Sequence, residues 1–110
     1  MKSLDYTRLH VVNVDHGDAM ILEIPDYEGQ AHFGIIDTGR PENIYKSRLS
    51  NYLKTLVEIR ELQDSEWRID FLCITHPHED HYGGLSSVIA NFQGKISQFW
   101  DCGFRTVAKT

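Results

Sequence analysis

IDFLCITHPHEDHYGG, residues 69–84, joins a nearly unbroken apolar run to a cluster of histidines. The run at 69–75 has the length and composition of a strand buried on both faces of a sheet. Three of the six histidines and one aspartate follow within six residues: His76, His78, Asp80 and His81. Since α/β folds carry their chemistry on loops at the C-terminal ends of strands, this loop is the candidate site.

The spacing of the cluster indicates metal binding. Pro77 disfavours helical geometry at His76, so the loop begins extended, and residues two apart then point the same way. We therefore expect His76 and His78 to bind one cation. Asp80 and His81 precede a helix that begins at the glycines, and a turn there would direct them toward a second cation. Imidazole and carboxylate suit zinc, and also manganese or iron.

A solvated surface loop is the alternative to a metal site. Histidines on such a loop would need no partner and would serve only to keep the surface polar. The position directly after a buried strand favours metal ligation, because a polar, histidine-rich loop is an unusual sequel to such a strand.

The remainder of the chain predicts a mixed α/β protein. Residues 8–14, 19–24 and 31–37 are rich in β-branched residues, end at turn signals and are close enough to form an antiparallel meander. An amphipathic helix is expected over about 44–63, starting near Pro41, with one apolar face on the sheet. Its stripe is Tyr45, Leu49, Tyr52, Leu56 and Ile59, widened by Leu53 and Val57. A partner-binding helix is the alternative for this segment.

A short helix at 83–92 and a strand at 95–100 complete the order βββ–α–β–α–β. The length of 110 residues allows one domain at most. Apolar residues make up 41% and charged residues 25%, which is typical of an ordinary globular protein with a core.

The charge and composition of the chain bear on its binding partners and its location in the cell. Eleven basic and 16 acidic residues give a net charge of −5, so no basic surface indicates nucleic acid or an anionic membrane, although bound cations would supply local positive charge. No apolar run approaches the ~20 residues of a membrane span, and no signal region follows the start. Cys73 and Cys102 lack a metal or disulfide spacing, so we predict a cytoplasmic protein that does not engage the membrane.

Three motifs resemble one family. THPHEDHYGGL (75–85) resembles the HxHxDH signature of the metallo-β-lactamase fold superfamily, and IIDTG (35–39) resembles its first motif, a strand ending in aspartate. NVDHGDAMIL (13–22) is similar to the opening hairpin of the branch related to the competence DNA-uptake channel. The resemblance implies an αββα sandwich of the α/β (α+β) class.

The resemblance also implies roles for individual residues. His76 and His78 would bind a first metal, and Asp80 and His81 a second. The two ions, expected to be zinc, would activate a bridging water as hydroxide, with Asp80 as the catalytic residue that orients the water or moves its proton. Asp37 would orient ligands without binding metal; its alternative role is a strand-end turn residue.

The other histidines and cysteines have simpler expected roles. His16 lies in a turn and is expected to be solvated, although a reach to the site is the alternative. His10 and His32 fall in strand patterns and are predicted to be structural, and Cys73 falls in a buried run and is predicted to lie in the core. We expect no role for Asp101 and Cys102.

The chain departs from the family after the motif. The family completes its site with a histidine, an aspartate and a last histidine, whereas here Asp101 is the only acid beyond the motif and no histidine follows His81. We therefore expect residues 1–110 to be the N-terminal part of a single metallo-β-lactamase-like domain. Its C-terminal half would come from the same chain in cis or a second chain in trans, and the 110 residues alone would be inactive.

The leading hypothesis is part of a dinuclear metal-dependent hydrolase that uses a metal-bound hydroxide. The hairpin resemblance favours a phosphodiester or nucleic acid as substrate; another ester-like bond, such as a thioester, lactone or β-lactam, stays open, as do non-hydrolytic iron relatives. The alternative is a catalytically incomplete sensing or assembly module that acts through a partner or the rest of a longer protein. A structural zinc site is disfavoured, because such sites are usually closed by four cysteine-rich ligands.

Overall fold

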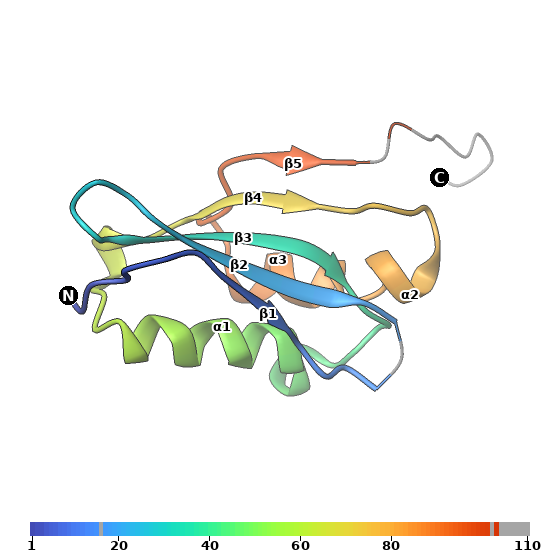
Figure 1. The fold of residues 1–110 in the computed structure, drawn as a ribbon. Coiled ribbons are helices and arrows are strands. Elements are labelled where there is room, and N and C mark those ends of the chain that lie inside the picture. The colour runs from blue at the N-terminus through green and yellow to red at the C-terminus, as the bar shows by residue number, and fades with distance from the viewer. Residues whose placement is uncertain (16, 102, 104–110) are drawn as a thin grey trace.

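The computed structural model describes residues 1–15, 17–101 and 103, which form a mixed α/β fold of one sheet and one helical layer (Figure 1). The sheet has five strands in the order β1-β2-β3-β4-β5. They are β1 (Arg8–Val11), β2 (Ala19–Pro25), β3 (Ala31–Thr38), β4 (Ile69–Cys73) and β5 (Phe99–Trp100). The first three strands pair antiparallel, as the predicted meander requires, and β3, β4 and β5 pair parallel.

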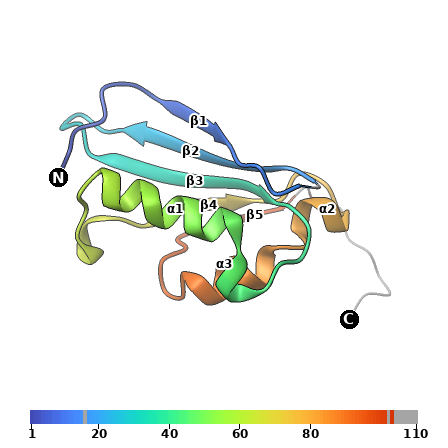
Figure 2. The same ribbon diagram turned by 90° about the horizontal axis from the view of Figure 1, so that it is seen from below.

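The helices are short and mostly lie on one face of the sheet. They are η1 (Ile44–Lys46), α1 (Arg48–Ile59), η2 (Asp64–Glu66), α2 (Glu79–Tyr82) and α3 (Leu85–Asn91). Figure 2 shows α1 and α3 side by side across the same face. None of the helices in the described part of the chain is long and apolar enough to cross a membrane.

The predicted helix over 44–63 is divided in two. The side chain of Asn43 caps η1, and that of Ser47 accepts a hydrogen bond from the backbone N–H of Ser50 at the start of α1. Both caps satisfy N–H groups that have no partner inside the helix, so the helix begins at its caps and not near Pro41. Of the predicted apolar stripe, Tyr45, Tyr52 and Ile59 are exposed. The buried apolar face of α1 consists of Leu49, Leu53 and Leu56.

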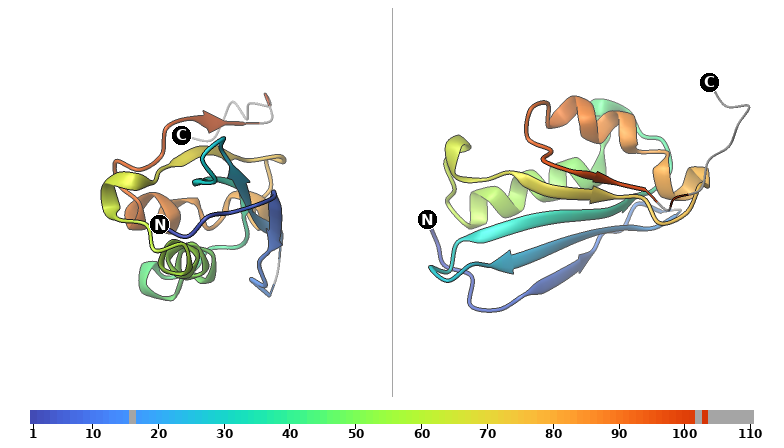
Figure 3. Two further views of the ribbon diagram at one scale, coloured as in Figure 1. Left: turned by 60° about the vertical axis from the view of Figure 1, so that its left-hand side comes forward. Right: turned by 90° about the horizontal axis from the view of Figure 1, so that it is seen from above.

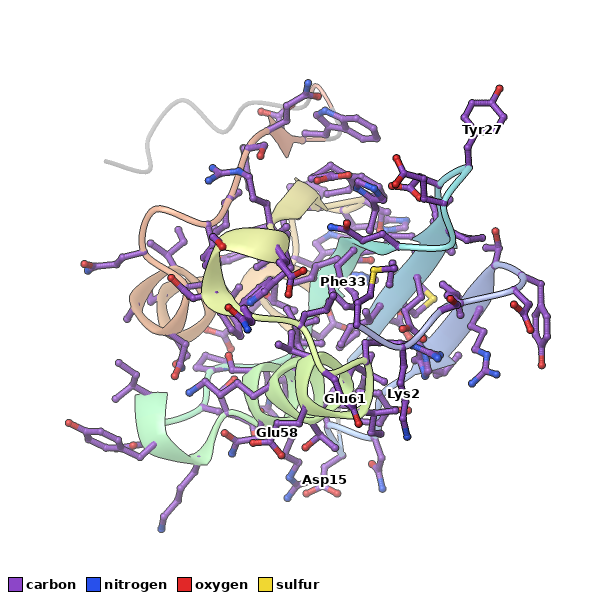
Figure 4. All side chains as sticks on the ribbon, turned by 90° about the vertical axis from the view of Figure 1, so that its left-hand side faces the viewer. Lys2, Asp15, Tyr27, Phe33, Glu58 and Glu61 are labelled. Carbon is purple, nitrogen blue, oxygen red and sulfur yellow. The ribbon has the colours of Figure 1, made fainter. Side chains whose placement is uncertain are left out.

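The core lies between the sheet and the helical layer. Phe33 of β3 is 1% exposed and its side chain lies toward the helices, as Figure 4 shows. Its ring meets that of Trp67 edge to face at 6.2 Å, and Trp67 meets Phe92 in the same way at 6.0 Å. Such pairs stabilise a core beyond the area that they bury, so these aromatics fix how the sheet sits on α3.

The opposite face of the sheet is open, which corrects the prediction of a strand buried on both faces. Phe71 and Cys73 of β4 are partly exposed, and the left-hand view of Figure 3 shows α1 and α3 together on one side of the sheet. The ring of Phe71 stacks on that of Trp100 at 4.5 Å and 4°. Cys73 therefore lies on this apolar face and not in the core.

A buried ion pair connects the end of α1 to the sheet. Glu23 of β2 is 0% exposed, and its carboxylate accepts hydrogen bonds from Arg60 Nε at 2.8 Å and from His10 Nε2 at 2.8 Å. Burial raises the pKa of Glu23, but the bonds from Arg60 and His10 outweigh it and hold this pKa below its ordinary value. The predicted structural role of His10 is consistent with this contact.

Replacement of Arg60 tests how much the fold depends on this pair. Arg60→Met should lower the free energy of unfolding by about 3 kcal/mol, because it leaves a buried carboxylate without its main partner. Lys2→Met is the control: Lys2 and Glu61 form an exposed pair at 3.8 Å (Figure 4), and its loss should cost less than about 1 kcal/mol. Urea unfolding measures the loss of stability in both variants. Equal losses would contradict a special role for the buried pair of Arg60 and Glu23.

The same pair should make part of the stability sensitive to acid. The pKa of Glu23 is lower in the folded chain, so its contribution is present above the unfolded value and is lost as pH falls through the folded value. Glu23→Gln has no such group to protonate. Urea unfolding should therefore show a smaller loss of stability between about pH 6 and about pH 3 for Glu23→Gln than for the wild type; parallel curves would argue against it.

Candidate functional site

The C-terminal ends of β3 and β4 bring two distant motifs together. The strands pair in parallel, with Ile36 opposite Cys73, so the residues that follow each strand emerge at the same edge of the sheet. Asp37 lies near the end of β3, and Thr75 and the histidine cluster follow β4. In Figure 1, α2 lies beyond this edge. The predicted position of the site at the C-terminal ends of strands is therefore found in the structure.

The cluster is part extended and part helical. His78 has extended geometry (φ −118°, ψ 148°) and precedes α2, so Asp80 and His81 lie within a helical turn of their own. The prediction placed these two residues just before a helix at 83–92; that helix is α3, and α2 is additional. The turn returns the ring of His81 to within 4.5 Å of the ring of His76, measured between centroids. The ring of His78 lies 6.3 Å and 6.4 Å from those of His76 and His81.

Asp37 is the buried anchor of the site. Its side chain is 2% exposed and its backbone is left-handed (φ 61°). One carboxylate oxygen accepts a hydrogen bond from the backbone N–H of Thr75 at 2.7 Å. The other accepts from Thr75 Oγ1 at 2.6 Å and lies 3.0 Å from His81 Nδ1. The end of β3 is thereby joined to the end of β4 and to α2.

These contacts fix which nitrogen of His81 is free. A carboxylate only accepts, so Nδ1 of His81 carries the hydrogen that bonds Asp37, and Nε2 keeps a lone pair when the ring is neutral. The hydrogen bond to Asp37 raises the pKa of His81, while burial opposes it; the negative charges of Asp37, Asp80 and Asp18 raise it further. Metal binding at Nε2 requires the neutral ring and therefore displaces a proton at low pH.

Three of the side chains lie close enough together to belong to one metal site. Asp37, His76 and His81 each offer one ligand atom, and these atoms lie within 4.8 Å of one another. Asp80 Oδ1 lies 3.7 Å from His81 Nε2, beside the free nitrogen. Imidazole nitrogens with carboxylate oxygens are a donor set that zinc, manganese and iron accept, so the residues fit a metal. The division of the four motif residues between two ions stays a prediction.

Two residues of this edge were not singled out from the sequence. Thr75 contacts Asp37 through both its backbone and its hydroxyl; its only sequence signal is its place between the apolar run and the first histidine. Asp18 follows the turn before β2: its N–H donates to the carbonyl oxygen of Asp80 at 3.1 Å, and its carboxylate lies 3.7 Å from His81 Nδ1. The Gly-Asp turn could have indicated it.

The remaining candidates lie away from this cluster or outside the described residues. His32, at the start of β3, lies between Asp26 at 3.0 Å and Asp70 at 3.2 Å, which is consistent with its predicted structural role. His16 and Cys102 fall outside the described residues.

The turn between β1 and β2 packs directly on the histidine cluster. Gly17 has φ +86°, and a Cβ at this position would lie 2.0 Å from the carbonyl oxygen of Asp80. At the other side of the site, a Cβ on Gly84 would lie 2.3 Å from the carbonyl oxygen of Thr38. Only glycine allows these approaches, so the glycines of the two motifs set how closely the three segments meet.

The fold and the histidine–carboxylate cluster define a class, that of mixed α/β proteins with a candidate metal site at a strand edge. The sequence model of the metallo-beta-lactamase superfamily matches residues 13–96, more than half of the chain, and the chain belongs to that superfamily. The match includes the Gly-Asp turn, Asp37 and the whole histidine cluster. No curated protein matches the chain. The closer similarity to the competence branch stays a prediction.

Replacement of Gly17 tests whether the turn holds the cluster in place. Gly17→Ala should cost more than about 1 kcal/mol of stability, since it adds a clash with Asp80 to the strain of a left-handed alanine, and it should weaken zinc binding. Gly94→Ala is the matched control, because Gly94 has φ +76° but no atom within 4 Å of the added Cβ. Urea unfolding and zinc competition measure both effects. Indistinguishable variants would refute the packing role.

Proposed function

We propose that the chain provides the metal-binding part of a metal-dependent hydrolase with two metal ions. The observation that carries the proposal is the packing of His76 and His81 against each other beside the buried carboxylate of Asp37, with Asp80 next to the free nitrogen of His81. Membership of the metallo-beta-lactamase superfamily supports it, because that superfamily typically binds metal ions. Zinc is the proposed metal, with manganese and iron as alternatives of similar ligand preference.

In this proposal His76 and His78 hold one ion, and Asp80 and His81 hold the other. The free Nε2 of His81 and the 3.7 Å approach of Asp80 support the second pair. Asp37 orients the ligands, because its oxygens already accept hydrogen bonds from Thr75 and His81. A carboxylate that fixes the far nitrogen of a metal-binding histidine also raises the basicity of the nitrogen that binds.

The bound ions would lower the pKa of a coordinated water and polarise the bond to be cleaved. The protein's own contribution would come from Asp80, whose side chain is 51% exposed on α2 and would orient that water or accept its proton. Because the backbone of α2 is held by Thr38 and by the turn at Asp18, the carboxylate of Asp80 is carried on an anchored element.

The site needs ligands beyond those that converge here. His76, His78 and Asp80 are exposed, so each ion would face solvent on the side away from the sheet. We propose that further ligands reach this side from a C-terminal half of the same domain in cis, or from a second chain in trans. The open apolar face beside Phe71 and Trp100 would accept the same half.

A phosphodiester, including nucleic acid, is the proposed substrate. Support comes from the resemblance of residues 13–22 to the competence branch, and from the close approach of Gly17 in this segment to Asp80. Other ester-like bonds are the alternatives within the same chemistry. The open apolar face favours one other function, a sensing or assembly module that keeps the metal loop and acts through a partner.

Metal binding by the purified chain tests the proposal. Zinc titration against a chromophoric chelator should show binding that falls about 100-fold or more in His76→Ala and His81→Ala, because each variant removes a donor atom. His32→Ala, at the other end of β3, is the control and should bind as the wild type does. Loss of zinc in all three variants, or binding in none of the proteins, would contradict the site.

Assays of hydrolysis distinguish the proposed hydrolase from the sensing or assembly module. The zinc-loaded protein, with any continuation of its chain, should cleave bis(p-nitrophenyl) phosphate faster than a thioester or lactone, and His81→Ala should abolish the activity. A chain that binds zinc but cleaves none of these would support the module.

A further inference from the structure

We propose that Thr75 is a positioning residue, whose hydroxyl holds the ring of His76 and sets which of its nitrogens is free to bind metal. The inference rests on the proposed metal site and assigns a role to a residue outside the ligand set. Thr75 lies between the end of β4 and the histidine cluster, and its Oγ1 contacts both Asp37 and His76.

The direction of each hydrogen bond follows from the chemistry of the three groups. Thr75 Oγ1 lies 2.6 Å from Asp37 Oδ2, and since a carboxylate only accepts, the hydroxyl hydrogen points to Asp37. Oγ1 then has only lone pairs left for His76 Nδ1, which lies 2.8 Å away. The hydrogen of the neutral His76 ring must therefore be on Nδ1, and Nε2 is left to bind metal.

The same carboxylate oxygen of Asp37 also determines which nitrogen of His81 carries the hydrogen. Asp37 Oδ2 also accepts from His81 Nδ1 at 3.0 Å, so Asp37 acts on His81 directly and on His76 through Thr75. The two rings lie 4.5 Å apart, and both present Nε2. Adjacent rings that each keep a free nitrogen can both supply ligands to one metal centre.

His76 depends on this bond more than His81 does. The ring of His81 is 12% exposed, whereas His76 is exposed and does not have burial to hold it. Without a partner at Nδ1, the ring can rotate and can carry its hydrogen on Nε2, where it blocks metal binding. The hydroxyl of Thr75 removes this alternative.

The structure allows the hydroxyl to be removed by itself. The backbone N–H of Thr75 donates to Asp37 Oδ1 at 2.7 Å, and this bond does not involve the side chain. Valine keeps the shape and the β-branched backbone preference of threonine. Thr75→Val therefore removes the hydrogen bonds of the hydroxyl to Asp37 and His76 and keeps the backbone bond to Asp37. Thr75→Ser keeps the hydroxyl.

The first measurement is the tautomer of each ring in the metal-free protein, read from imidazole ¹⁵N shifts by NMR at a pH where both rings are neutral. The wild type and Thr75→Ser should carry hydrogen on Nδ1 of both His76 and His81. In Thr75→Val, His76 should gain the Nε2–H form and His81 should not. Thr55→Val, which loses an exposed helical hydroxyl bonded to the carbonyl of Asn51, should leave both rings unchanged.

Zinc affinity is the second measurement, by competition with a chelator. Thr75→Val should bind about 10-fold more weakly than the wild type, as expected for loss of a partner that orients a ligand, and Thr75→Ser should recover most of this loss. An unchanged His76 tautomer in Thr75→Val, or an equal loss in Thr55→Val, would overturn the inference. A wild type that binds no zinc would refute the metal site, while the ring tautomers would still decide the role of Thr75.

Discussion

The carboxylate of Asp37 is the interaction on which this edge of the molecule depends. A charged group that is 2% exposed is costly to bury unless it is bonded, and here two segments remote in sequence supply the bonds. Thr75 at the end of β4 gives two of them, and His81 in α2 gives the third. Loss of any donor would leave part of the charge unsatisfied, so the position of α2 follows from Asp37 as much as from its own helical propensity. The left-handed backbone at Asp37, which costs of order 1 kcal/mol, is offset by these bonds.

The sheet makes this contact available because β3 and β4 are parallel. Parallel strands require a crossover, and α1 supplies it on the face that also carries α3. The crossover is fastened at its far end by Arg60, which reaches back to the buried Glu23 of β2. Two buried carboxylates, near opposite ends of α1, therefore hold neighbouring elements of the fold together. Glu23 keeps the helix on the sheet, and Asp37 holds the loop that follows the next strand.

The sequence predicts the strands, the meander and the place of the candidate site, because each depends on a local pattern of apolar residues followed by a turn. The sequence does not predict features that depend on contacts with residues distant in the chain. The cap at Ser47 overrides the helix start near Pro41, and an apolar run such as β4 does not say which of its two faces is covered. The bond between Asp37 and Thr75 spans 38 positions and becomes visible only when β3 and β4 are paired. The histidine spacing identifies candidate ligands, but not which nitrogen each ring presents.

Two turns with left-handed residues lie beside the histidine cluster, and their contacts favour a metal site over a solvated surface loop. Asp15 and Gly17 in the turn before β2, and Asp37 and Gly39 at the end of β3, all have positive φ angles between 61° and 86°. These two turns flank the histidine cluster and bond to each other through the N–H of Gly39 and the carbonyl of Asp18. A solvated surface loop needs no such support, since exposed histidines gain nothing from being fixed. Ligands for a metal do gain, because affinity rises when the donor atoms are held in place before the ion arrives. The left-handed backbone also occurs at Glu61, away from the cluster, so it is the bond between the two turns, together with the contacts of Asp37, that holds the donor atoms in place.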